Sequence, residues 1–271
     1  MKRIFTSFLL LLGGLAIFVL GNPYYSVFPT NGNKNYSFGL AIVFLISALA
    51  LKRTKSLAVY APSVYSLFVA TAALFFLNTG ILNLHNSTMP PLQNLAVDKF
   101  SQFLHIVPLS IALMLLAGNN LKSIFIHQGN LKQGLKFGLI SFAVFALISI
   151  GIGMQADVFT TSSWTEILWL LLFIFANATM EELWLRGIFL RNYEAIIGRN
   201  AAIFITAAVF GASHINATYD FPGGGIIFGL LVFVLGVVGA HAMLKDDSVI
   251  GPVLFHAGYD LLVIVPVLNS L

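Results

Sequence analysis

The sequence predicts an all-α protein: a polytopic membrane helical bundle with about nine transmembrane helices and a cytoplasmic N-terminus. Of its 271 residues, 58% are hydrophobic and only 9% are charged, whereas soluble domains carry about 25% charged residues. The apolar residues form long runs, and the basic residues gather in alternate connections. This composition excludes a soluble globular domain, a disordered chain and a nucleic-acid binder. Because cysteine is absent, disulfides and thiolate metal sites are excluded as well.

Nine apolar stretches are candidates for crossing a bilayer, which takes roughly 20 residues per helix. None alternates with the period of two that a membrane β-barrel requires. The stretches are centred on Ile4–Leu20, Tyr36–Leu51, Leu57–Leu82, Phe103–Leu116, Phe137–Gly153, Trp164–Leu190, Ala201–His214, Gly225–Met243 and Ile250–Leu268. The second and the fourth are short, so eight spans is the alternative count.

The basic residues provide a separate test of this count. With nine spans and a cytoplasmic N-terminus, only Lys34 and Lys99 of the 14 lysines and arginines fall in outer segments. This distribution is the one that the positive-inside bias produces. Removing one of the first four spans would invert part of it, which favours nine spans over eight.

The ionisable residues divide the chain into three parts. Residues 1–120 hold four spans and form a predicted N-terminal accessory region. A basic cytoplasmic connector follows at residues 121–136, where Gly129-Asn130 marks a turn. Residues 137–271 hold five spans and nearly all the intramembrane ionisable groups, so we expect any chemistry there. The remaining acidic residues, Asp246 among them, fall in or beside predicted loops, where solvation accounts for them.

An acidic side chain near the middle of a span costs about 2.5–3.5 kcal/mol on insertion, so each one needs a reason. Three short motifs lie on the sixth, seventh and ninth stretches: Glu181, Glu182 and Arg186; Phe210 and His214; His256 and Asp260. At about 1.5 Å of rise per residue, the three stretches place these groups at similar depths, to within about a helical turn. We therefore expect neighbouring helices to bring them together.

The spacing within each helix is informative too. Glu182 and Arg186 are four residues apart and can pair along one face. Glu181 is rotated by about 100° from Glu182, so one carboxylate can be held by the arginine while the other points into a cavity. His256 and Asp260 are also four residues apart, the spacing at which a carboxylate orients an imidazole.

Several kinds of chemistry would use such a cluster. A carboxylate and an imidazole that converge on a water molecule can activate it for attack on a carbonyl, while a second imidazole donates to the oxyanion. The same groups could hold a divalent metal whose bound water attacks. A proton or ion pathway would also use them, and so would purely structural pairing of buried groups.

Taken together and in this order, the three motifs resemble those of the CAAX-protease and bacteriocin-processing family, also called the ABI family, which includes the type II CAAX prenyl proteases. The resemblance covers about residues 137–271 and implies a catalytic five-span core with the activity of an intramembrane glutamic endopeptidase. It implies that Glu181 activates water with the help of His214. It also implies that His256 and Asp260 face the oxyanion.

The resemblance gives Glu182, Arg186 and Phe210 supporting positions, in which an ion pair fixes the helix and a ring packs the cavity wall. One position departs from the prenyl proteases, which carry Asn where this chain has Asp260. An ionised aspartate cannot donate a hydrogen bond. Asp260 must therefore be protonated, or must act by orienting His256.

These observations lead to a functional expectation. We expect an endopeptidase that cleaves a peptide or membrane-protein substrate within the lipid bilayer, with no nucleic-acid partner, in the plasma (inner) membrane of a prokaryote. We expect no cofactor, and a metal-dependent version of the protease is the alternative. A non-catalytic immunity or regulatory protein of the same fold is the hypothesis from a different class.

Overall fold

The computed structural model describes residues 2–21, 32–156, 164–216 and 224–270. These segments are almost entirely helical and contain no β-strand, which confirms the predicted all-α class. In chain order the elements are α1 (Lys2–Leu15), η1 (Ala16–Leu20), α2 (Gly32–Arg53), η3 (Ala58–Tyr60), α3 (Ala61–Thr79), α4 (Pro91–Leu116), η4 (Leu121–Ile124), α5 (Leu131–Gln155), α6 (Trp164–Glu182), η5 (Leu183–Gly187), α7 (Leu190–Ile197), α8 (Arg199–Ala212), α9 (Gly224–Asp246), α10 (Ile250–Ile264) and η6 (Val265–Ser270). The elements η1 and η5 are π-helical, and the other η elements are 3₁₀ helices.

Eight helical stretches in the described part of the chain are long and apolar enough to cross a membrane. The seventh predicted span corresponds to α8, which has only 14 residues. It is therefore about 21 Å long, less than the roughly 30 Å thickness of the hydrocarbon core. Eight full-length candidates and one shorter apolar helix thus stand where nine stretches were predicted. The side of the membrane on which each end lies stays a prediction.

Two spans that looked short in the sequence are full-length helices. The second is α2, with 22 residues, and the fourth is α4, which begins at Pro91 and has 26. Proline fits the first helical turn, where its missing N–H has no partner to lose. The polar residues that follow, including Asp98 and Lys99, kept this part of α4 out of the apolar pattern. Both therefore lie in a helix rather than in or beside a loop.

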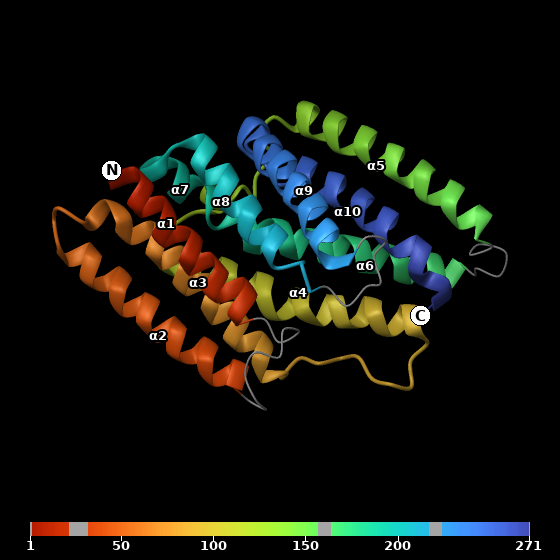
Figure 1. The fold of residues 1–271 in the computed structure, drawn as a ribbon, viewed down its shortest axis with the longest axis horizontal. Helices are drawn as coiled ribbons and strands as arrows, with labels where there is room; N and C mark the ends of the chain where they lie inside the picture. Colours follow the sequence, from red (N-terminus) through yellow and green to blue (C-terminus); the bar gives the residue numbers. More distant parts are fainter. Residues whose placement is uncertain (1, 22–31, 157–163, 217–223, 271) are drawn as a thin grey trace.

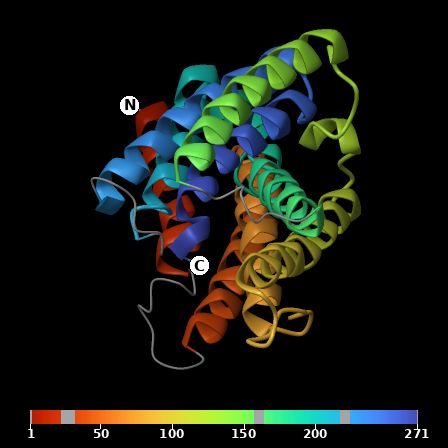
Figure 2. The ribbon, with the colours of Figure 1, turned by 90° about the vertical axis from the view of Figure 1, so that its right-hand side faces the viewer.

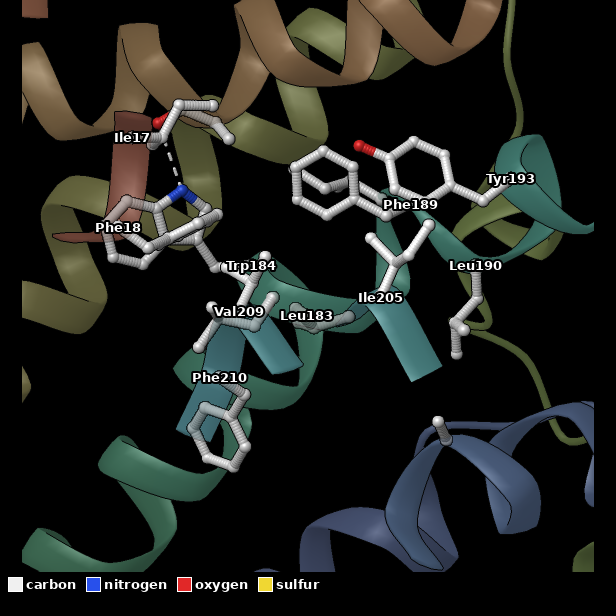
Figure 3. Close-up of a cluster of buried hydrophobic side chains, with 14 of the residues drawn as sticks. Ile17, Phe18, Leu183, Trp184, Phe189, Leu190, Tyr193, Ile205, Val209 and Phe210 are labelled. Carbon is white, nitrogen blue, oxygen red and sulfur yellow. Dashed lines mark hydrogen bonds between the residues drawn. The ribbon is translucent and has the colours of Figure 1, made fainter. Parts of the chain in front are cut away.

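The sixth predicted span is not a single α-helix. Its α-helical part, α6, ends at Glu182 and continues as the π-helix η5 before α7 begins. A π turn holds more residues than an α turn, and such segments are frequent next to functional sites. Packing supports the wide turn: Trp184 lies edge-on against Phe18, with 4.8 Å between ring centroids. Its indole nitrogen donates to the carbonyl oxygen of Ala70 at 3.1 Å, and Figure 3 shows Trp184 beside Phe18.

The helices that carry the three motifs lie close to one another. Figures 1 and 2 both show α6 passing between α4 and α10. The short helix α8 packs along α9, which also contacts α10. Helix α5 packs along α10 and forms one edge of the bundle in Figure 1, while α2 forms the opposite edge.

Glycines allow α5 and α10 to approach closely. A Cβ atom added to Gly138 of α5 would lie 2.7 Å from the Cβ atom of Leu254, and one added to Gly251 of α10 would lie 2.9 Å from the carbonyl oxygen of Gly134. Both distances are shorter than real Cβ contacts. Small residues four apart are a common means of packing helices tightly in membranes.

The connector between α4 and α5 is anchored to the end of α9. Gly129 has a φ of +51°, and a Cβ atom there would lie 2.3 Å from the carbonyl oxygen of Asp246, so only glycine fits. The N–H of Asn130 donates to that same oxygen at 2.6 Å. Asp246 itself, predicted in or beside a solvated loop, is 2% exposed. The prediction of a solvated Asp246 was wrong because the connector and the glycine-rich face of α5 cover this end of α9.

Candidate active site

Side chains from α4, α6, α9, α10 and the end of α8 enclose a small cavity. The space within it that the centres of water molecules can occupy is about 50 Å³. One water molecule needs about 10–15 Å³ of such volume, so a few can fit. The cavity is lined by polar residues from both halves of the chain: Lys99, Asn177, Glu181, His214, His256, Tyr259 and Asp260. The four predicted catalytic residues are all among them, and the remaining walls are apolar.

Glu181, close to the end of α6, lines this cavity with a carboxylate that faces both histidines. Its Oε2 atom lies 3.5 Å from Nε2 of His256 and 3.8 Å from Nε2 of His214. This oxygen is buried and has no hydrogen-bond partner among the described residues. The three atoms face one another at distances longer than usual hydrogen bonds. A water molecule bound among them could contact all three.

His214 lies in the turn that follows α8. Its Nδ1 atom is 2.9 Å from the carbonyl oxygen of Phe210. The carbonyl can only accept, so this contact assigns the proton of a neutral imidazole to Nδ1. The Nε2 atom of His214 is then free to accept a proton or a hydrogen bond on the side of Glu181.

Glu182 binds His256 through the ring nitrogen that does not face Glu181. Its Nδ1 atom lies 2.8 Å from Oε1 of Glu182, and the same oxygen accepts a hydrogen bond from Nη1 of Arg186. Glu182 and Arg186 are completely buried, and they form the pair that their spacing predicts. The contact between Glu182 and His256 was not predicted, because spacing along one helix carries no information about the next.

Asp260 follows His256 by one helical turn on α10. Its Oδ1 atom lies 3.5 Å from Nε2 of His256, and its Oδ2 atom accepts a hydrogen bond from Nδ2 of Asn177 at 3.0 Å. One carboxylate oxygen of Asp260 is thus bound by the amide of Asn177, and the other faces the imidazole of His256. Asn177 was not predicted as a site residue, although its position four residues before Glu181 placed both on one face of α6.

The ring of Phe210 contacts both histidines and the arginine of the buried ion pair. Its ring lies edge-on to His214 and to His256, with centroid distances of 4.7 and 5.6 Å. In addition, Cζ of Arg186 lies 4.3 Å from the ring centroid, a distance typical of cation–π contacts. The ring therefore lines the cavity, as predicted, and also covers the guanidinium group.

The N-terminal half contributes a cation to the cavity wall. Lys99 of α4 lines the cavity, although it was predicted to lie in an outer segment. The reason is the unrecognised start of α4, which runs beside α6. Tyr259 also lines the cavity, and its hydroxyl group is buried without a hydrogen-bond partner among the described residues.

A metal site was the alternative expectation for these side chains. Within the ranges that the structure describes, no group of three or more His, Asp or Glu side chains is arranged to hold a metal ion. The prediction of a reaction without a cofactor remains a prediction, and it requires a test on the protein itself.

Comparison with known proteins adds one finding to this geometry. Residues 162–262 match the family model described as type II CAAX prenyl endopeptidase Rce1-like, and this segment contains all seven residues of the three motifs. No curated protein and no solved structure matches the chain. The matched family implies a membrane protease, and hence a hydrolase with a peptide or protein substrate. The resemblance that the three motifs predict is therefore confirmed for residues 162–262, which are Rce1-like in sequence.

Proposed function

We propose that this protein is an intramembrane glutamic endopeptidase in which Glu181 and His214 activate a water molecule. The observation that carries the proposal is the convergence of Oε2 of Glu181 and the Nε2 atoms of both histidines on one small buried cavity. The family match supports the reaction class, since it implies a membrane endopeptidase.

The reaction begins with the water molecule. The Glu181 carboxylate takes one proton from it, while Nε2 of His214 accepts a hydrogen bond from its other hydrogen. The water oxygen then attacks the carbonyl carbon of the scissile peptide bond, and the carbonyl π electrons move to the oxygen. A positioned base of this kind contributes about 10²–10⁴-fold to a rate.

The resulting oxyanion needs a hydrogen-bond donor. His256 supplies it as an imidazolium: its Nδ1 donates to Glu182, and the second proton, on Nε2, faces the oxyanion. Asp260 holds the imidazole in place from the adjacent turn. The carboxylic acid of Glu181 then returns its proton to the amide nitrogen as the C–N bond breaks. The products are a carboxylic acid and an amine, and Glu181 is again ionised.

The substrate class follows from where this site lies. The site lies among helices long enough to cross a membrane, so the cleaved bond is reached within the bilayer. We infer a peptide or membrane-protein substrate, and the plasma membrane of a prokaryote as the location.

Comparison of protein termini tests the proposal. Membranes of cells that carry the wild type or Glu181→Gln, at matched abundance, are analysed for new N-termini and C-termini. We expect termini that occur with the wild type and disappear with Glu181→Gln. Glu166→Gln is the matched control, because Glu166 is exposed in the first turn of the same helix, and it should give the wild-type pattern.

Two further outcomes would favour a different function. Identical termini in all three strains, together with a loss of stability in Glu181→Gln, would favour a non-catalytic immunity or regulatory protein. Activity that a chelator abolishes and that one divalent metal restores would favour the metal-dependent protease. In that case, metal analysis of purified Glu181→Gln and His214→Ala should show a reduced metal content.

A further inference from the structure

A second and larger cavity lies between α5, α8 and α9. Its volume is about 620 Å³, within the range of roughly 300–1,000 Å³ that is usual for ligand pockets. It shares no lining residue with the active-site cavity. Its lining residues lie near the start of α5, the start of α8 and the end of α9, and so at one end of these helices. This is also the end that the distribution of basic residues predicts to be cytoplasmic.

One side of this cavity is apolar and opens onto the outer surface of the helical bundle. Phe137 from α5 and Ile203 and Phe204 from α8 contribute to it, and Phe204 is 57% exposed. These helices carry exposed apolar side chains along their outer faces, where a membrane protein meets acyl chains. A ligand with a hydrocarbon part would therefore find a continuous apolar path from the bilayer into the cavity.

The other side of the cavity is polar and carries both signs of charge. Lys245 and Asp246, adjacent at the end of α9, line it together with His241. Asp246 is 2% exposed, and its buried Oδ1 atom has no hydrogen-bond partner among the described residues. An unsatisfied carboxylate oxygen in such a place is costly unless a donor binds it. The exposed ammonium group of Lys245 is a ready partner for an anion.

We propose that this cavity binds a phospholipid whose headgroup carries a primary ammonium group as well as a phosphate. The ammonium group donates to Asp246, the phosphate binds Lys245, and the acyl chains lie along the apolar wall formed by Phe137 and Phe204. Basic pockets between transmembrane helices near the cytoplasmic surface commonly bind lipid headgroups. The Oδ1 atom of Asp246, which has no hydrogen-bond partner among the described residues, adds a requirement for a donor. The site is separate from Glu181 and does not depend on the proposed proteolysis.

Lipid retention by the purified full-length chain tests this assignment. Detergent-solubilised protein is mixed with equal amounts of phosphatidylethanolamine, phosphatidylcholine and phosphatidylglycerol, and native mass spectrometry measures the bound lipid. Phosphatidylcholine has the same charges as phosphatidylethanolamine but no N–H donor, and phosphatidylglycerol has no cation. We expect phosphatidylethanolamine to be retained about tenfold or more over either, as for a hydrogen bond between charged groups.

Three variants separate the two parts of the headgroup. Asp246→Asn should reduce the retention of phosphatidylethanolamine to that of phosphatidylcholine. Lys245→Gln, at an exposed position, should weaken the binding of phosphatidylethanolamine and phosphatidylglycerol alike. Lys132→Gln, at an exposed lysine in the first turn of α5, is the matched control and should change nothing.

Specific outcomes would overturn the proposal. Equal retention of the three lipids by the wild type would do so, as would an unchanged lipid preference in both Asp246→Asn and Lys245→Gln. Glycerophosphoethanolamine, which has the headgroup without acyl chains, is expected to bind poorly. If it binds as well as the lipid, the ligand is a soluble molecule and the lipid assignment is wrong.

Discussion

Two adjacent carboxylates of α6 have different surroundings, although both face His256. Glu182 is completely buried, and one of its oxygens binds both Arg186 and His256. Glu181 lines the cavity, and its Oε2 has no hydrogen-bond partner among the described residues. The first arrangement is that of a structural ion pair, and the second is that of a group available to a ligand or a water molecule.

This difference predicts opposite effects of the same substitution. Glu182→Gln leaves the buried charge of Arg186 uncompensated, so we expect the free energy of unfolding to fall by about 3–5 kcal/mol. Glu181→Gln removes a charge without breaking a pair of this kind, and its melting temperature should stay close to that of the wild type. Thermal unfolding of both purified variants in the same detergent measures this. A comparable loss in both would contradict the division of roles.

Asp260 offers a second test on the scale of single residues. Asp260→Asn keeps an oxygen that can accept from Asn177, and its amide N–H can donate to the oxyanion beside His256. We therefore expect Asp260→Asn to retain activity, while Asp260→Leu should lower the cleavage rate by about 10²–10³-fold, the usual effect of losing oxyanion stabilisation. Rates on a substrate identified by its termini provide the measurement. Equal inactivity of both variants would show that the negative charge itself is required.

Among the helices, the packing of α5 along α10 depends on missing side chains. Gly138→Ala would force a Cβ atom to within 2.7 Å of Leu254, so we expect a loss of about 1–3 kcal/mol of stability, as for other overpacked sites. Gly151 lies in the same helix, where an added Cβ atom meets nothing within 4 Å. Gly151→Ala is the matched control and should be neutral, or stabilising by up to about 1 kcal/mol. Thermal unfolding compares the two, and equal effects would refute the close approach.

The elements themselves were largely predictable, because long apolar runs are the strongest signal that a membrane sequence contains. The start of α4 was not, since Asp98 and Lys99 interrupt the apolar pattern of a helix that is well formed. The π-helical segment after Glu182 was not predictable either. Within this segment Trp184 packs against Phe18 and Ala70, which come from parts of the chain more than 100 residues away, and such contacts cannot be read from the local sequence.

Considered as a whole, the molecule does not separate at the connector. Ser66 of α3 donates to the carbonyl oxygen of Ile188 at 2.7 Å and accepts from Asn192 at 2.9 Å. Helix α4 packs against α6, and α1 packs against α8. The division into an accessory region and a catalytic core was predicted from the positions of the ionisable groups, and it reflects where the motifs lie. It describes the packing of the chain less well, because helices of the two parts contact each other.

This interlocking predicts the behaviour of fragments. Residues 121–271 expressed alone should be degraded, because the faces of α6 and α8 that contact α4 and α1 would be uncovered. Expressed together with residues 1–120 as a separate chain, the fragment should accumulate and co-purify with it. Immunoblotting of membranes with and without the second fragment measures this. Full accumulation of residues 121–271 alone would show that the core is independent.

The composition of the site was more predictable than its connections. Motif spacing singled out Glu181, His214 and His256, which line one cavity, and predicted the pairing of Glu182 with Arg186; their catalytic roles stay a prediction. It could not reveal contacts between helices, such as Glu182 with His256, because these depend on how the helices rotate against one another.

The distribution of the site over α6, α8 and α10 has a consequence for biosynthesis. Glu182 and Arg186 are four residues apart, so their charges can neutralise each other as soon as this segment coils, which lowers the cost of moving it from the translocon into lipid. His256 and Asp260 arrive on α10, which the ribosome makes only after α6 and α8. A nascent chain therefore carries its carboxylate into the bilayer well before the imidazole of His256 joins it. We expect the protein to remain without hydrolytic activity until α10 has been inserted.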